Sequence, residues 1–233
     1  MDNPVHILYT GLATDIERTA SMPAGMEMDC IPFIRTVPND DPETLAQLKD
    51  LSAAEATVVL TSPKAVDWVF AHVPVKPNWQ IACMEGTTFK KLQDQGWGSM
   101  VKYTAGNGAA LAKEMIADPA VKAVVFMGSK LRLANLPDAL AKSGIALKEL
   151  VAYQTLPVHQ ELNKSYDGIV FLSPSAVDSF FEQYETDGTT VFFAIGETTA
   201  AAVKKYTNNK VIVAADVQRE TLLQTIYNYY YQS

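Results

Sequence analysis

One eight-residue stretch of this chain occurs twice. Leu60–Asp67 reads LTSPKAVD, and Phe171–Asp178, which begins 111 residues later, reads FLSPSAVD. At the same offset the pair Thr87-Thr88 falls on Thr198-Thr199, and no gap is needed. We therefore expect two copies of one structural unit, with the functional site where the two copies face each other.

Short apolar runs alternate with helix-like segments along the chain, which is typical of parallel sheets with helical crossovers. The expected strands are Val5–Thr10, Met26–Ile34, Ala56–Thr61, Trp79–Met84, Met100–Tyr103, Val121–Met127, Ala146–Tyr153, Gly168–Leu172, Val191–Ile195 and Val211–Ala214. The expected helices are Ala13–Met22, Glu43–Leu51, a helix that starts at Ser62, Thr87–Gln95, Gly108–Ala117, Leu131–Lys142, Pro174–Tyr184, Thr198–Tyr206 and Arg219–Tyr230. This alternation predicts the α/β class.

A second, weaker repeat relates the N-terminus to the middle of the chain. Gly25–Met28 resembles Gly144–Leu147, which lies 119 residues later. The middle of the chain carries five expected strands and the C-terminal part only three, so the C-terminal part needs the two N-terminal strands to match. We expect two flavodoxin-like parallel-sheet domains, one of them discontinuous, joined by a two-stranded connector. The expected limits are residues 1–34 with 157–233 for the discontinuous domain, 38–150 for the inserted domain, and 31–38 with 149–157 for the connector.

Composition and charge exclude several classes of protein. A hydrophobic content of 48% with 19% charged residues is ordinary for a globular protein. No apolar run approaches the roughly 18 residues of a membrane helix, and the N-terminus lacks a secretory signal pattern. Cys30 and Cys83 have no metal or redox spacing, so we expect thiols in a reducing cytoplasm. The net charge of −7 and the lack of a basic run argue against nucleic-acid binding.

Five small, hydroxylated loops are expected at the carboxyl ends of the strands, where ligands bind to open parallel sheets. They are Thr61–Pro63, Met84–Thr88, Gly128–Lys130, Ser173–Ser175 and Gly196–Thr199. Each opens a helix, and a helix N-terminus can bind a carboxylate or phosphate without net basic charge. The alternative for each loop is an ordinary helix cap, and the repeated cap can reflect the duplicated fold alone.

Standard catalytic constellations are missing from the sequence. His6, His72 and His159 are scattered. There is no phosphate-binding glycine loop and no nucleophile elbow, so we expect no metal and no cofactor. The remaining candidate is Tyr153, whose phenol would lie at the connector. It would either face the cleft between the domains or stack on the linker.

Six motifs follow one another in a recognisable order. They are Thr61-Ser62-Pro63-x-Ala65-Val66, Gly128 with Arg132, Leu136-Pro137-x-x-Leu140 running to Gly144, Val151-x-Tyr153-x-Thr155, Phe171-x-Ser173-Pro174-Ser175, and Ala194-Ile195-Gly196-x-Thr198-Thr199-Ala200. In order and spacing together they resemble the uroporphyrinogen-III synthase family along nearly the whole chain. The chain departs from the family pattern at Gly11, where arginine is common, and in the loop from Gly128 to Leu136, which is longer than usual.

The resemblance implies a cofactor-independent lyase (a hydro-lyase) of tetrapyrrole, or haem, biosynthesis. Its substrate would be hydroxymethylbilane, a linear tetrapyrrole with eight carboxylates. Its product would be uroporphyrinogen III, formed with inversion of the terminal pyrrole through a spiro intermediate. The resemblance implies that Tyr153 is the catalytic general acid. It also implies substrate contacts from the loops of both copies: Ser62, Pro63, Gly128, Ser129, Ser173, Ser175, Gly196, Thr198 and Thr199.

The expected partners follow from the same resemblance. They are the small-molecule substrate and a transient contact with the preceding enzyme of the pathway, with no nucleic acid, no membrane and a monomeric protein. The competing interpretation is a non-catalytic two-domain binding module that closes on a small anionic ligand. Turnover of hydroxymethylbilane discriminates between the two.

Overall fold

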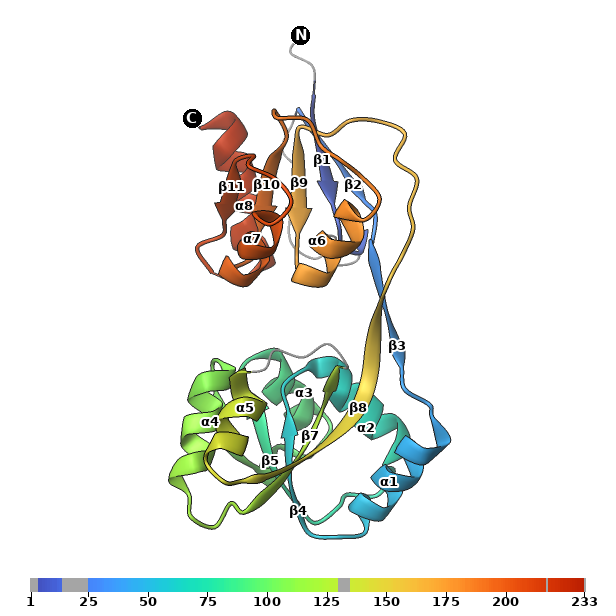
Figure 1. Cartoon of the computed structure of the whole chain (residues 1–233), viewed down its shortest axis with the longest axis vertical. Helices are drawn as coiled ribbons and strands as arrows, with labels where there is room; N and C mark the ends of the chain where they lie inside the picture. Colours follow the sequence, from blue (N-terminus) through green and yellow to red (C-terminus); the bar gives the residue numbers. More distant parts are fainter. Residues whose placement is uncertain (1–3, 14–24, 130–134, 217, 233) are drawn as a thin grey trace. The chain divides into compact units, whose positions relative to one another are not determined.

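The computed structural model describes residues 4–13, 25–129, 135–216 and 218–232. Nearly all of the expected helix Ala13–Met22, and the first residues of the expected helix Leu131–Lys142, lie outside them. The chain divides into two compact units, Met1–Arg35 with Leu156–Ser233 and Thr36–Thr155 (Figure 1). The expected domain limits stay a prediction.

The first unit is built on a five-stranded parallel sheet with the strand order β11-β10-β9-β1-β2. Its strands are β1 (Val5–Tyr9), β2 (Met26–Cys30), β9 (Gly168–Phe171), β10 (Val191–Ala194) and β11 (Val211–Val213). Two strands come from the N-terminal part of the chain and three from the C-terminal part. Strands β9 and β10 are buried at every residue, which is typical of parallel strands covered on both faces.

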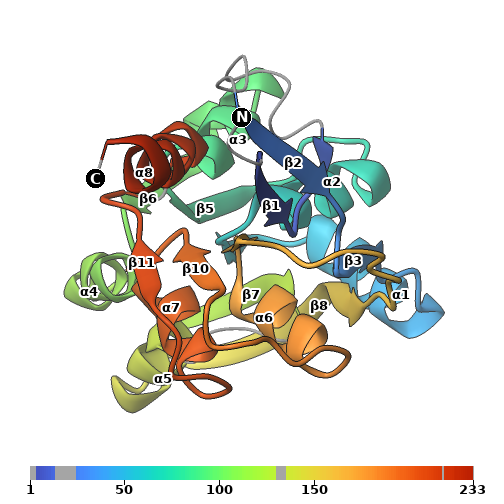
Figure 2. The same cartoon turned by 90° about the horizontal axis from the view of Figure 1, so that it is seen from above.

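Helices cover both faces of this first sheet. They are α6 (Pro174–Phe181), α7 (Glu197–Val203) and α8 (Arg219–Tyr231). Figure 2 shows α6 and α7 on one side of the sheet and α8 on the other. Phe180 packs with Phe192 in the core under α6 and α7, and Ile226 packs with Phe193 in the core under α8. Because consecutive side chains of a strand point to opposite faces, Phe192 and Phe193 serve two separate cores.

The second unit is built on a six-stranded sheet with the strand order β3-β8-β7-β4-β5-β6. Its strands are β3 (Ile34–Pro38), β4 (Ala56–Leu60), β5 (Trp79–Met84), β6 (Val101–Ala105), β7 (Ala123–Ser129) and β8 (Ala146–Pro157). Its helices are α1 (Pro42–Ser52), α2 (Pro63–His72), α3 (Thr87–Asp94), the 3-10 helix η2 (Gly98–Met100), α4 (Gly108–Ala117) and α5 (Asn135–Lys142). The five strands from β4 to β8 pair in parallel.

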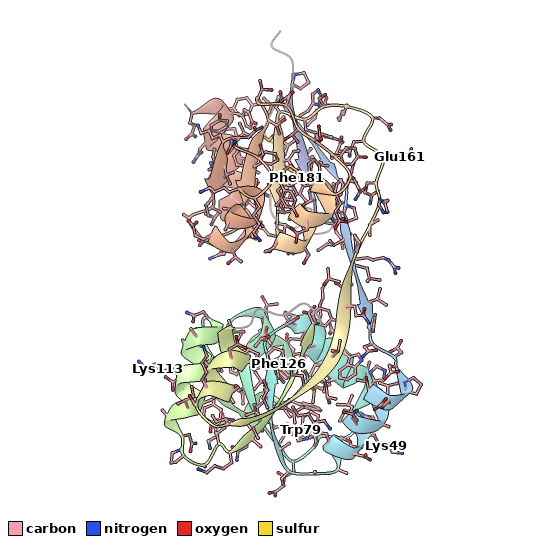
Figure 3. The ribbon with its side chains drawn as sticks, viewed as in Figure 1. Lys49, Trp79, Lys113, Phe126, Glu161 and Phe181 are labelled. Carbon is pink, nitrogen blue, oxygen red and sulfur yellow. The ribbon has the colours of Figure 1, made fainter. Side chains whose placement is uncertain are left out.

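Two cores also flank the sheet of the second unit, one under α1, α2 and α3 and the other under α4 and α5. Trp79 on β5 and Phe126 on β7, both labelled in Figure 3, belong to different cores. Trp68, Trp79 and Trp97 all lie in the first of these cores. Cys83 lies there too, and burial raises the pKa of its thiol to about 11. That thiol therefore stays protonated at neutral pH.

The two units share one strand order. Numbered from β1, the first sheet reads 2-1-3-4-5, which is the flavodoxin order. The second sheet, apart from β3, has the same order when numbered from β7 through β8, β4, β5 and β6. Strand β4 thus corresponds to β9 and β7 to β1, as both sequence repeats indicate. The expected class of two flavodoxin-like parallel-sheet units is confirmed.

The chain passes between the units in β3 and β8, which are neighbours in the sheet. The expected single strand Met26–Ile34 is wrong, since β2 ends at Cys30 and β3 begins at Ile34. Pro32 lies between them; it has no N–H to donate and it restricts the residue before it, so a strand rarely continues through such a position. The expected strand Ala146–Tyr153 is too short, since β8 continues to Pro157.

Asn39 fastens the end of β3 to β8. Its backbone N–H donates to the carbonyl oxygen of Ala152 at 3.0 Å, and its side-chain amide donates to that of Val151 at 2.8 Å. At the other end of the ladder the N–H of Val158 donates to the carbonyl oxygen of Phe33 at 2.8 Å. The two segments therefore run in opposite directions, and the ladder fixes the register of β8 where the candidate general acid lies.

Candidate active site

The duplicated Ser-Pro stretch starts a helix in the second unit. Ser62 has extended backbone angles, and its side-chain oxygen accepts a hydrogen bond from the N–H of Lys64 at 3.1 Å, so it caps α2. Pro63 takes the first helical position, where its missing N–H costs nothing. The cap places the Ser62 hydroxyl just after the carboxyl end of β4, at the edge where parallel sheets bind ligands.

A cavity of about 500 Å³ opens at this edge of the second unit. Its polar lining residues include Thr61, Ser62, Asn107, Ser129 and Tyr153, and its apolar lining residues include Met84, Phe126 and Leu136. Three of the expected site residues, Ser62, Ser129 and Tyr153, come from three separate segments of the chain and meet around this one cavity. We call it the Ser62 cavity.

The phenol of Tyr153 reaches across to the helix cap. Tyr153 is half-buried on β8, where it packs against the core under α1, α2 and α3. Its hydroxyl donates to the side-chain oxygen of Ser62 at 3.0 Å. The candidate general acid is therefore held by a serine that itself caps a helix.

Two helix N-termini contribute to the Ser62 cavity. Ser62 caps α2 and Asn107 caps α4, where the Asn107 side chain accepts a hydrogen bond from the N–H of Ala110 at 2.9 Å. Each helix has 10 residues and carries a partial positive charge at this end. No charged side chain is among the described residues that line the cavity. Among the described residues, N–H and hydroxyl groups are therefore the ones that could hold an anionic group there.

Tyr153 also lines a second cavity of about 500 Å³. The charged or ionisable residues that line it are Asp40, Lys64, Asp67 and His72. The Lys64 ammonium group donates to the hydroxyl of Thr36, and Asp67 is paired with Lys91 at 2.5 Å. Tyr153 therefore borders two cavities: the Ser62 cavity, whose described lining carries no charged side chain, and a charged cavity beside α2.

Gly128 has a packing role that the sequence did not indicate. It is buried in β7, and a Cβ atom built on it would lie 2.7 Å from Cε1 of Phe126, closer than real Cβ contacts. Glycine at this position therefore lets the Phe126 ring pack against the backbone. Gly128 lines neither of the two cavities beside Tyr153, whereas the next residue, Ser129, lines the Ser62 cavity.

The first unit repeats the same kind of edge. Ser173 caps α6 and accepts a backbone N–H of that helix at 3.3 Å, and Ser175 is half-buried in the first turn. On the neighbouring strand β10, Gly196 occupies the cap position of α7, Thr198 is exposed, and Thr199 is buried. The expected site residues thus form two groups, one at the carboxyl edge of each sheet.

Asn107 lines the Ser62 cavity although it is not among the site residues expected from the sequence. An asparagine directly before a helical segment is an N-cap signal, and that signal would have placed Asn107 at the sheet edge. The apolar lining residue Phe126 carries no such signal, because in sequence it looks like any core residue of a strand, whereas Met84 belongs to the expected loop Met84–Thr88.

In the part of the chain that the structure describes, no group of three or more His, Cys, Asp or Glu side chains is placed to hold a metal ion. His6 lies 3.2 Å from Glu27, and His72 lies 3.5 Å from Asp40. Neither histidine lines the Ser62 cavity. A helix long and apolar enough to cross a membrane is not found among the described residues.

Comparison with known proteins gives concordant results. The family model described as uroporphyrinogen-III synthase HemD matches residues 19–224. Uroporphyrinogen-III synthetase from Helicobacter pylori is similar in structure with a TM-score of 0.67 and 17% identity, over 97% of this chain and 99% of that chain. A mutant uroporphyrinogen III synthase from Thermus thermophilus has a TM-score of 0.67 and 16% identity, over 98% of this chain and 99% of that chain. A search of curated proteins found no match.

At these identities the solved structures show a shared fold, while the family match extends over most of the sequence. The chain belongs to the uroporphyrinogen-III synthase family.

Proposed function

We propose that this chain converts hydroxymethylbilane into uroporphyrinogen III as a cofactor-independent lyase of haem biosynthesis. The family and the fold support an enzyme of tetrapyrrole biosynthesis. The observation that carries the proposal is the hydrogen bond from the Tyr153 phenol to the Ser62 hydroxyl in the wall of the Ser62 cavity. It puts a proton donor beside helix N-termini at a sheet edge where ligands bind.

The binding part of the proposal follows from charge. The substrate carries eight carboxylates, yet the protein has a net charge of −7. The overall charges of protein and substrate therefore repel each other, and the affinity has to come from local groups. The N-termini of α2 and α4, with the hydroxyls of Ser62 and Ser129, are such groups.

The first chemical step would be loss of the terminal hydroxyl of the substrate. Tyr153 acts as the general acid, the hydroxyl leaves as water, and an azafulvene forms. Attack at the substituted carbon of the last pyrrole gives the spiro intermediate, which fragments and closes again with that ring inverted. Much of the remaining catalysis is positional, because the protein has to hold the substrate so that this carbon is attacked.

The proposal also assigns substrate contacts to the cap residues of both sheets. In the second unit they are Ser62, Pro63, Gly128 and Ser129, with Gly128 acting through the packing of β7. In the first unit they are Ser173, Ser175, Gly196, Thr198 and Thr199. The support is that both groups lie at carboxyl edges and at the starts of helices.

The partners are proposed on the same basis. The chain would act as a monomer in the cytoplasm, with hydroxymethylbilane as substrate. A transient contact with the preceding pathway enzyme would deliver this substrate, which closes to the wrong isomer by itself.

The test is to supply freshly generated hydroxymethylbilane and to separate the product isomers. The proposal predicts that isomer III accumulates faster than spontaneous closure. If only isomer I forms, at the spontaneous rate, the proposed activity is wrong. Binding of hydroxymethylbilane without isomer III would then identify a binding module.

A further inference from the structure

We infer that the Ser62 hydroxyl donates its proton to the departing hydroxyl of the substrate. Tyr153 then donates its own proton to Ser62 and replaces the one that Ser62 has lost. This inference rests on the proposed function and deepens it. It assigns the substrate-facing step to a residue of the duplicated cap and makes Tyr153 the second member of a two-hydroxyl relay.

The arrangement of hydrogen bonds around the Ser62 oxygen carries the inference. A serine hydroxyl has one proton to donate and two acceptor positions. The phenol is the more acidic of the two hydroxyls, so Tyr153 is the donor in its 3.0 Å hydrogen bond with Ser62, while the N–H of Lys64 donates to the same oxygen at 3.1 Å. The Ser62 proton is therefore left to be donated elsewhere, and no acceptor for it is found among the described residues. Because Ser62 lines a cavity that has no charged side chain among its described residues, a bound substrate is the partner that this proton can meet.

The surroundings favour the negative charge that such a transfer leaves behind. The N–H of Lys64 points at the Ser62 oxygen, and α2 places its positive end there. Lys64 also lines the second cavity beside Tyr153, together with Asp40 and Asp67, and Asp67 is neutralised there by Lys91. Fixed dipoles and charges aimed at the place where charge develops lower the barrier without rearranging during the reaction.

The proton balance of the relay closes without a co-reactant. The Ser62 proton passes to the leaving oxygen, and the C–O bond breaks with both electrons on that oxygen, which departs as water. The lone pair of the pyrrole nitrogen is delocalised toward the carbon that has lost the hydroxyl, and an exocyclic C=C bond of the azafulvene forms there. The Tyr153 proton moves to Ser62 and leaves a phenolate. When the closed ring loses the proton from its attacked carbon, the same two hydroxyls carry one proton back to Tyr153.

The repeat shows that the cap alone does not make the relay. Ser173 caps α6 in the same way and accepts a backbone N–H at 3.3 Å. At the offset of 119 residues, however, Tyr153 falls on Ile34, which has no proton to give. Ile34 packs against the apolar core under α6 and α7. The relay is thus specific to the second unit, because Tyr153 contacts the cap residue Ser62 there, and the cap residue Ser173 of the first unit has Ile34 as its counterpart of Tyr153.

The test compares single-turnover rates of hydroxymethylbilane in the full chain for Ser62→Ala, Tyr153→Phe and the double variant. A positioned general acid contributes at least about 100-fold, so each single variant should slow the reaction by about that factor. Since both residues act on one proton, the double variant should be no slower than the slower single variant. Ser62→Thr keeps the hydroxyl and should stay within about tenfold of the wild-type rate, a small loss beside the full contribution of a general acid.

A control separates the relay from the loss of a helix cap. Asp41→Ala removes the cap of α1 in the same unit, where the Asp41 carboxylate accepts the N–H of Thr44 at 2.9 Å. This variant should unfold more easily yet keep its turnover. If Ser62→Ala does not fold, Ser62→Asn replaces it, because asparagine also caps helices and lacks a hydroxyl proton.

Two results would overturn the relay: wild-type turnover in Ser62→Ala while Tyr153→Phe is slow, or a double variant slowed by the product of the single effects. The first result would mean that Tyr153 protonates the substrate directly. Failure of the proposed function looks different, because the wild-type chain itself would then form no isomer III.

Discussion

The phenol of Tyr153 and the hydroxyl of Ser62 lie 91 residues apart in sequence and 3.0 Å apart in space. One belongs to the strand that passes between the two units, and the other belongs to the helix cap that the chain contains twice. The hydrogen bond between them joins the unique part of the chain to the duplicated part. The proposed proton transfer depends on this hydrogen bond.

Tyr153→Phe should lower the turnover of hydroxymethylbilane by 100-fold or more, since general acids contribute about 10²–10⁴-fold. Folding should change little, because one half-buried hydrogen bond is worth only about 0.5–1.5 kcal/mol. The matched control is Tyr206→Phe, which removes an exposed phenol that donates to Asp178 at 2.9 Å. Steady-state kinetics with isomer analysis measures both variants. Equal turnover in the two would remove Tyr153 from the chemistry.

Asn39→Ala should destabilise the second unit by about 1–3 kcal/mol, because the carbonyl oxygen of Val151 loses its amide donor. The readout is the urea midpoint followed by tryptophan fluorescence. All three tryptophans lie in the second unit, and Trp68 donates directly to the Asn39 carbonyl oxygen at 2.9 Å. Gln95→Ala changes an exposed side chain of the same unit and should shift stability by no more than about 0.5 kcal/mol. Equal midpoints for the two variants would show that Asn39 does not fasten β3 to β8.

Gly168→Ala should destabilise the first unit by about 1–3 kcal/mol through overpacking. A Cβ atom at Gly168 would lie 2.7 Å from Cδ1 of Ile7 and 2.9 Å from the hydroxyl oxygen of Tyr230. The control is Gly188→Ala, since a Cβ atom there meets nothing within 4 Å. Differential scanning calorimetry is the appropriate measurement, because the first unit contains no tryptophan. A Gly168→Ala protein as stable as the control would contradict the packing of β9 against β1.

The contribution of Asp118 to the free energy of unfolding should depend on pH and should be lost in acid. Its pKa is lowered to about 2 by the N–H of Ala120, with further hydrogen bonds from Lys102 and Tyr103. A carboxyl whose pKa falls on folding stabilises the folded state above its ordinary pKa of 3.8, and this contribution disappears as the pH falls toward about 2.

The corresponding measurement compares urea midpoints of the wild-type protein and Asp118→Asn, again by tryptophan fluorescence. The difference between them should be constant at neutral and weakly acid pH and should shrink below about pH 4, where an unperturbed aspartate begins to bind its proton. A difference that does not change with pH would show that these hydrogen bonds do not favour the charged carboxylate.

Local signals in the sequence predicted much of the fold. The limits of α4, Gly108–Ala117, and of β5, Trp79–Met84, agree with the sequence because caps and alternating apolar runs mark them. The repeat predicted the shared strand order, which no single segment reveals. The expected strand Met26–Ile34 ran too far, because Pro32 is compatible with either an edge strand or a linker and only the structure shows that the chain leaves the first sheet there.

The candidate site was harder to predict than the fold. Ser62 carries a cap signal in sequence, and so does Asn107. The pairing of Ser62 with Tyr153, by contrast, depends on how far β8 runs and on its register against β7, which shifts between Gly128 and Ser129. The position of Gly128 under the Phe126 ring depends equally on neighbours in space. Sequence patterns report local preferences and do not contain these distances.

The most direct test of the central claim is the isomer composition of the product as a function of the concentration of this protein. Hydroxymethylbilane generated in place should give isomer III at an initial rate proportional to the protein concentration. Isomer I should form only from the substrate that is left to close by itself. A product that stays isomer I at every protein concentration, formed at the spontaneous rate, would contradict the account.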